Sequence, residues 1–195
     1  MQMHGYVIGY RDIENLLLVD CKIILEVKKI NIDDEAVVNE LTRADVWSMS
    51  REDISNLLQQ EWHCYAALHG GRIVASCFVY LGKKFEDKYM DREFILDRSE
   101  VYWWRGYTIQ EYRGLEVIPF LVAYLIKHLA DNYNKTRGFF FVRRSNKSML
   151  RGFQKLGLYP LGWVGFIELF GIRFHYLWGR KALKETRKRC FVALR

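Results

Sequence analysis

The chain has 195 residues, half of them hydrophobic and only two of them prolines, so it is neither disordered nor too short to bury a core. Its formal net charge of +7, with a pI near 9.2, would suit an anionic ligand, a nucleic acid or a membrane surface and does not choose among them. With no CxxC pair among its four cysteines, no signal peptide and no apolar run long enough to span a membrane, the sequence predicts a cytoplasmic protein without a metal site.

Hydrophobic periodicity predicts six elements in the first 81 residues. In order, these are a short strand at 6–8 within an N-terminal extension (1–21), a strand at 23–30, helices at 33–47 and 50–58, and strands at 62–68 and 73–81. Ser50 followed three residues later by Asp53 resembles a capping box at the start of the second helix. The Gly70-Gly71 pair between two β-rich runs is typical of a hairpin turn.

The second part of the chain predicts a charged loop and then six further elements. In order, these are the loop at 83–98, a strand at 101–109, a helix at 119–129, a strand at 138–142, a helix at 146–156, and strands at 161–170 and 172–178. A basic tail, 181–195, follows. No linker or repeat is visible, so residues 1–195 predict one α+β domain with a mixed, mostly antiparallel twisted sheet flanked by about four helices.

The segment from Gln110 to Ile118 is the most informative part of the sequence. A turn that ends in Arg113-Gly114 runs directly into an apolar helix. The first N–H groups of a helix have no partner within it, and the helix dipole adds partial positive charge at that end. The segment therefore predicts an anion site, for which a diphosphate is a natural occupant.

Two signatures together resemble the GNAT superfamily of N-acetyltransferases over about residues 22–180. The turn from Gln110 to Ile118 follows the family pattern Q/R-x-x-G-x-G/A up to Gly114, and the run from Asn146 to Leu158 aligns without a gap with the family's second signature. The sequence departs from the pattern where Glu116 and Ile118 replace the later glycines of the turn. It departs again at Phe153, which replaces a tyrosine that often protonates the leaving thiolate.

The resemblance implies that the chain binds acetyl-CoA or another acyl-CoA as co-substrate. The diphosphate would rest on the backbone of the turn, and the strand ending at Ile109 would separate from the strand beginning near Gly138 to admit the cofactor arm. For Asn146, contact with the arm and a simple helix N-cap remain equal alternatives. The implied cofactor-binding residues are Ile109, Arg113, Gly114, Leu115, Glu116, Val117, Ile118 and Asn146.

Acyl transfer to an amine requires a base for the nucleophile and an acid for the thiolate. Glu100, at the start of the strand that precedes the turn, is the candidate base, with Glu168 as a second choice. Tyr107 and Tyr176 are the candidate acids. For each of these residues a purely structural role, as a surface carboxylate or a packing aromatic, is the alternative.

The predicted function is therefore acyl transfer from coenzyme A to an amine of a small molecule, sugar or peptide, by direct attack in a ternary complex. One alternative is an acyl-CoA-binding module with weak or no turnover, because Phe153 cannot donate a proton. The last strands carry large apolar residues: Trp163, Phe166, Phe170, Phe174 and Trp178. These residues could form ordinary core or a homodimer surface, or they could line an apolar tunnel, in which case the chain would be a longer-chain acyltransferase. Nucleic-acid or membrane binding through the basic tail ranks last.

Overall fold

The structure, a computed structural model, describes residues 2–12, 19–34, 38–39, 42, 49–87, 92–158, 160–179 and 192–193. The helix expected at 33–47 falls mostly outside these residues, although Val38, Asn39 and Thr42 are helical. Most of the basic tail, 181–195, also lies outside them, with only residues 192–193 described. Three α-helices are defined within the described residues.

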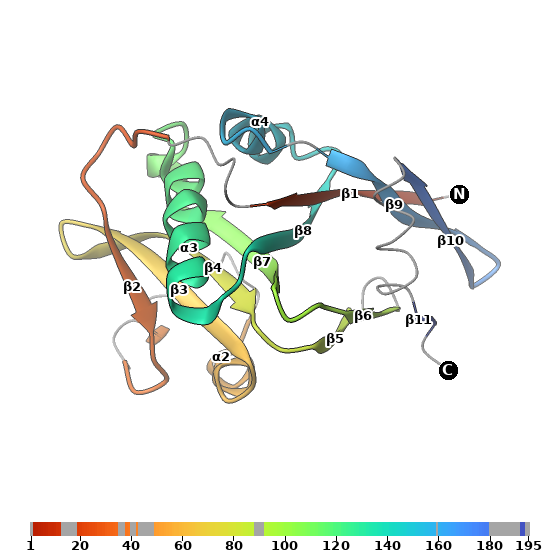
Figure 1. The fold of residues 1–195 in the computed structure, drawn as a ribbon, viewed down its shortest axis with the longest axis horizontal. Coiled ribbons are helices and arrows are strands. Elements are labelled where there is room, and N and C mark those ends of the chain that lie inside the picture. The colour runs from red at the N-terminus through yellow and green to blue at the C-terminus, as the bar shows by residue number, and fades with distance from the viewer. Residues whose placement is uncertain are drawn as a thin grey trace.

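An eight-stranded mixed sheet forms the centre of the molecule (Figure 1), in the order β10-β9-β1-β8-β7-β4-β3-β2. Its strands are β1 (Gln2–Asp12), β2 (Glu26–Ile30), β3 (Trp62–His69), β4 (Arg72–Tyr80), β7 (Glu100–Thr108), β8 (Arg137–Arg143), β9 (Pro160–Leu169) and β10 (Ile172–Gly179). All neighbours in this sheet are antiparallel except β7 and β8, which are parallel. The α+β class with a mixed, mostly antiparallel sheet is therefore confirmed.

The sheet separates two apolar cores, one on each of its faces, and the helices cover them. On one face, α2 (Arg51–Leu58) buries Ile54 with Trp62 and Phe78, and a smaller sheet completes the cover. On the other face, α3 (Val117–Tyr133) and α4 (Lys147–Lys155) bury Leu121 and Phe153 among the side chains of β4, β7 and β8. Because α3 is apolar on most sides, it can pack against both the sheet and α4.

Local sequence signals account for several of these elements. At α2, the Ser50 side chain accepts a hydrogen bond from the Asp53 N–H at 3.0 Å, and the Asp53 carboxylate accepts one from the Ser50 N–H at 2.9 Å, so the predicted capping box is confirmed. Between β3 and β4, Gly70 and Gly71 have φ values of 57° and 81°. This left-handed geometry is that of a tight hairpin turn and favours glycine at both positions.

The loop predicted at 83–98 is wrong in part, because β5 (Lys84–Asp87) and β6 (Arg92–Ile95) form a hairpin that β11 (Val192–Ala193) extends. Its inward side chains are aromatic: Phe85 and Phe94 are buried and their rings stack with centroids 5.1 Å apart. The charged residues that suggested a loop lie between these buried positions. A segment this short gives little alternation from which to recognise a strand.

The N-terminal strand is longer than the expected 6–8 and lies inside the sheet. β1 pairs with β8 from Tyr6 to Asp12 and with β9 from Gln2 to Gly9. The β9–β10 hairpin, which was expected and turns at Gly171, therefore reaches the rest of the sheet through β1. Hydrophobic pattern alone does not specify which strands are neighbours, so the position of β1 was not predictable from it.

Candidate cofactor site

A short turn connects β7 to the start of α3 and positions the predicted anion site. After a single 3-10 turn, η2 (Gln110–Tyr112), the chain reaches Gly114 with φ 80° and Glu116 with φ 64° before α3 begins at Val117. Both residues are left-handed, a conformation that disfavours side chains. A Cβ added at Gly114 would meet no atom within 4 Å, so the surface of the turn there is open.

Only some of the backbone N–H groups of this turn donate hydrogen bonds within the protein. The N–H of Tyr112 donates to Ile109 and that of Arg113 donates to Gln110, at 3.0 and 3.2 Å. In the described part of the chain, the N–H groups of residues 114–118 donate to no backbone or side-chain acceptor. Five successive free donors at the positive end of a 17-residue helix suit an anion.

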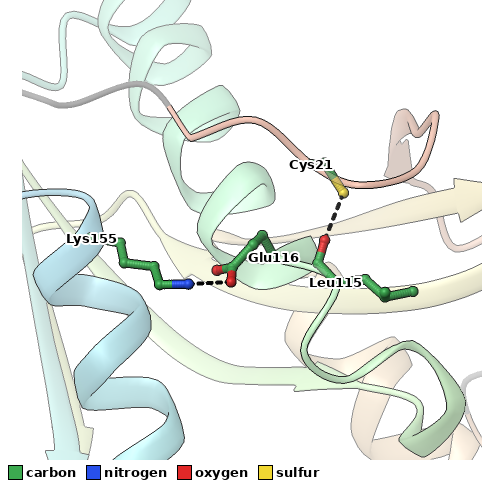
Figure 2. Close-up of polar contacts among 4 residues, drawn as sticks. All are labelled: Cys21, Leu115, Glu116 and Lys155. Atoms are coloured by element: carbon green, nitrogen blue, oxygen red, sulfur yellow. Dashed lines mark hydrogen bonds and ion pairs between the residues drawn. The ribbon is translucent and has the colours of Figure 1, made fainter.

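The carboxylate of Glu116 does not add a free negative charge to the turn, because the ammonium group of Lys155 pairs with it (Figure 2). The Glu116 side chain is 17% exposed and that of Lys155 is 55% exposed. The pair joins the residue immediately before α3 to the last residue of α4. In the sequence Glu116 stands out only as a departure from the family pattern, and its partner, 39 residues away in the chain, was not predicted.

A second missed contact holds the other side of the turn. The carbonyl oxygen of Leu115 accepts a hydrogen bond from the Cys21 thiol at 3.2 Å (Figure 2). It also accepts one from the Lys22 N–H at 3.3 Å. The side chains of Cys21 and Leu115 also pack against the core on the α3 face. The segment before β2 thus fixes the direction of the turn, and only its alternating apolar residues could have suggested a buried face.

The two parallel strands separate as the sequence predicted. The pairing of β7 with β8 covers Glu100–Trp103 and Arg137–Phe140 and does not continue to the ends of either strand. Beyond that point the ends of β7 and β8 diverge, with α4 beside the end of β8 (Figure 1). A bulge marks the same place on β7, where Arg105 has φ 50° and two residues, Arg105 and Gly106, lie opposite one residue of β4.

At the end of β7, the backbone groups that face away from β4 belong to Thr108 and not to Ile109. The Ile109 N–H donates to the Val74 carbonyl at 3.0 Å, so this amide faces β4. Because backbone groups alternate in direction along a strand, the N–H and C=O of Thr108 face the side of β8. The Thr108 carbonyl accepts a hydrogen bond from Nε of Arg113 at 3.2 Å, which folds the Arg113 side chain back onto β7.

Asn146 is the N-cap of α4, because its side-chain oxygen accepts a hydrogen bond from the Met149 N–H at 3.1 Å. Gly157, with φ 70°, follows the helix, and the Leu158 N–H returns to the Phe153 carbonyl at 2.8 Å. Both predicted ends of this helix are confirmed. The capping role uses the side-chain oxygen of Asn146.

The structure does not bring the three predicted catalytic residues together. Tyr107 lies on the part of β7 that borders the divergence, with the Arg113 guanidinium 5.7 Å from its ring centroid. Glu100 is buried at the opposite end of β7, where its carboxylate accepts the Asp97 N–H at 2.8 Å. Tyr176 lies on β10, four strands away, or roughly 20 Å at about 4.8 Å per strand.

The residues considered for other roles are also dispersed. Glu168 pairs with Arg173 at 3.0 Å within the β9–β10 hairpin. Of the large apolar residues in the last strands, Phe166 belongs to the core, whereas Phe170 and Phe174 are exposed and do not line an interior tunnel. Among the described residues, no three His, Cys, Asp or Glu side chains gather where they could hold a metal ion.

Comparison with solved structures shows which fold this is. A protein from Novosphingobium aromaticivorans assigned to the GNAT family of acetyltransferases superimposes with a TM-score of 0.55 and 15% identity, covering 82% of this chain and 61% of its own. A GCN5-related N-acetyltransferase from Kribbella flavida gives a TM-score of 0.53 and 11% identity, covering 80% and 54% of the two chains. The fold is that of the GNAT acetyltransferases.

A third structure with the GNAT fold is an aminoglycoside acetyltransferase from an uncultured soil metagenomic sample, solved with trehalose and also with sisomicin. Its TM-score is 0.52 at 15% identity, and the match covers 78% of this chain and 95% of that one. The present chain spans only between one half and two thirds of the first two structures. No protein-family model matches the sequence, and no curated protein sequence does so.

None of the helices that the structure describes combines the length and the apolar character needed to cross a bilayer.

Proposed function

We propose that this protein binds an acyl-coenzyme A at the turn before α3 and transfers the acyl group to an amine. The observation that carries the proposal is the run of free N–H groups at residues 114–118, next to the point where β7 and β8 separate. The N–H groups would bind the diphosphate, and the outward N–H of Thr108 would donate to a carbonyl of the cofactor arm. The GNAT fold supports this arrangement.

In the proposed reaction, the amine nitrogen attacks the thioester carbonyl, the C–S bond breaks, and the leaving thiolate takes a proton. Tyr107 is the acid that we carry forward, because it alone of the three candidates lies on the strand segment beside the divergence. Glu100 and Tyr176 lie too far away by strand geometry to act at the same carbonyl. Since the amine must be neutral to attack, its proton would leave through a water or a nearby carboxylate.

The acceptor class is the amine of a small molecule, sugar or peptide. An aminoglycoside acetyltransferase with the same fold makes amino sugars the first acceptors to test. The alternative, an acyl-CoA-binding module without turnover, draws support from Phe153, whose ring is buried 4.3 Å from that of Phe140 and carries no hydroxyl. It predicts tight cofactor binding with no free thiol released by any amine.

The test is calorimetric binding of coenzyme A and acetyl-CoA to the wild-type chain and to Gly114→Ala. The added methyl would occupy the open surface where the diphosphate should lie, so we expect at least a tenfold loss of affinity. Gly171→Ala is the matched control, because Gly171 has φ 78° and the same open surroundings but lies in the β9–β10 turn. Absence of binding to the wild type, or equal binding by both variants, would overturn the proposal.

A further inference from the structure

A side chain from α4 lies against β7 in the part of that strand that no longer pairs with β8. A Cβ added at Gly106 would lie 3.2 Å from Cε of Met149 and 3.9 Å from Cδ1 of Ile118. The end of the Met149 side chain therefore rests against the backbone of β7, one residue beyond the left-handed Arg105 of the bulge. Gly106 permits this contact because it has no side chain.

The other side chains around this position leave Met149 as the part that can move. The closed end of the divergence is packed by Phe140 and Phe153, which are each 8% exposed with ring centroids 4.3 Å apart. Ile118 is stiff at its first side-chain torsion because it is β-branched. Methionine has three rotatable bonds and no branch, so it changes rotamer at low cost.

The helix that carries Met149 is itself held in place. A Cβ added at Gly152 would lie 3.1 Å from Cγ of Pro119, so α4 and the first turn of α3 are in close contact. Lys155 and Glu116 form an ion pair one turn further along α4. A ligand entering between β7 and α4 thus meets a fixed helix and must displace a side chain.

We infer that Met149 controls entry of the cofactor arm, lying against the face of β7 at Gly106 when no arm is bound and rotating away when one is. The inference rests on the proposed function and adds a residue that determines affinity for the arm as distinct from the phosphates. Gly106 and Met149 act as a pair: one gives the space and the other fills it. Displacing Met149 opposes binding of the arm and leaves binding of the nucleotide part unaffected.

The test compares coenzyme A with adenosine 3′-phosphate 5′-diphosphate, the same nucleotide without the arm, by calorimetry. For Met149→Ala we expect coenzyme A to bind about tenfold tighter while the nucleotide binds as before. For Gly106→Ala, whose methyl would crowd Met149 out of its resting position, we also expect coenzyme A to bind more tightly, and the double variant should bind no tighter than Met149→Ala. Leu150→Ala, on the same helix and partly buried in the same core, should leave the ratio of the two affinities unchanged.

The outcomes distinguish failure of the role of Met149 from failure of the proposed function. If the wild type binds both ligands but their affinity ratio is the same in Met149→Ala, the role of Met149 is refuted and the proposed function stands. If neither ligand binds to any of the folded proteins, as checked by circular dichroism, both conclusions are overturned.

Discussion

The ammonium group of Lys155, on α4, holds the carboxylate of Glu116 at the left-handed residue that precedes α3. Removing the cation in Lys155→Met would leave the carboxylate unpaired beside the free N–H groups of the turn, where it would repel a diphosphate. We expect about a tenfold loss of affinity for coenzyme A, measured by calorimetry. Lys84→Met, which breaks the Lys84–Glu93 pair at 2.5 Å on the β5–β6 hairpin, is the matched control and should bind normally.

The reverse substitution, Glu116→Gly, should not weaken binding, because it removes the charge that Lys155 neutralises. It also relieves a left-handed backbone conformation that costs a residue with a side chain roughly 1–2 kcal/mol. The lost ion pair offsets at most about 1 kcal/mol of that gain. Weaker coenzyme A binding by Glu116→Gly than by wild type would contradict this account of the turn.

The Cys21 thiol is one of two donors to the Leu115 carbonyl, so its loss should loosen the segment that holds the turn. In Cys21→Ala we expect faster amide hydrogen exchange at Lys22, whose N–H is the remaining donor. The loss in free energy of unfolding should not exceed about 1 kcal/mol, the net value of a single hydrogen bond. Cys21→Ser keeps a donor at the same position, and exchange as fast as in the alanine variant would argue against the contact.

His63, on β3, should make the stability of the protein depend on pH. Burial, with smaller contributions from Lys29 on β2 and His128 on α3, lowers the pKa of His63 from 6.5 to about 4. Between these two values the unfolded chain binds a proton that the folded chain does not, so stability falls as the pH drops through this window. His63→Phe should show a smaller loss between pH 7 and pH 5 in urea unfolding. An NMR titration that places the pKa of His63 near 6.5 would refute the prediction.

The turn of the β9–β10 hairpin should be improved by a single substitution. Phe170 is fully exposed with φ 52°, and Gly171 follows with φ 78°, which is the geometry that favours Asn-Gly. Phe170→Asn should raise the free energy of unfolding by about 0.5–1 kcal/mol, because asparagine tolerates the left-handed region better. Phe174→Asn, also exposed but within the strand, should give no gain, and equal behaviour of the two variants would contradict the explanation.

Features specified by neighbouring residues could be predicted from the sequence. The Asn146 cap, the left-handed Gly157, the Gly70-Gly71 turn and the capping box at Ser50 each depend on a few adjacent positions. The location of the turn before α3 follows from the same kind of signal. Its role in binding a diphosphate stays a prediction.

Features that join distant segments could not be predicted. The partner of Glu116, the donors to Leu115 and the neighbours of β1 each depend on how the chain folds back on itself. The same limit applies to the candidate catalytic residues. Residue type made Glu100 and Tyr176 suitable, but their distance from the divergence follows from strand length and strand order.

The place of β1 in the sheet also sets an order of events during protein synthesis. Asp12 pairs with Arg137, 125 residues later in the sequence, and Gln2 pairs with Glu168. The first strand therefore leaves the ribosome long before either partner exists, and closing so long a loop carries an entropic cost that must be met before the pairing stabilises anything. We expect insertion of β1 to be a late step in maturation, with the C-terminal hairpin unattached until it occurs.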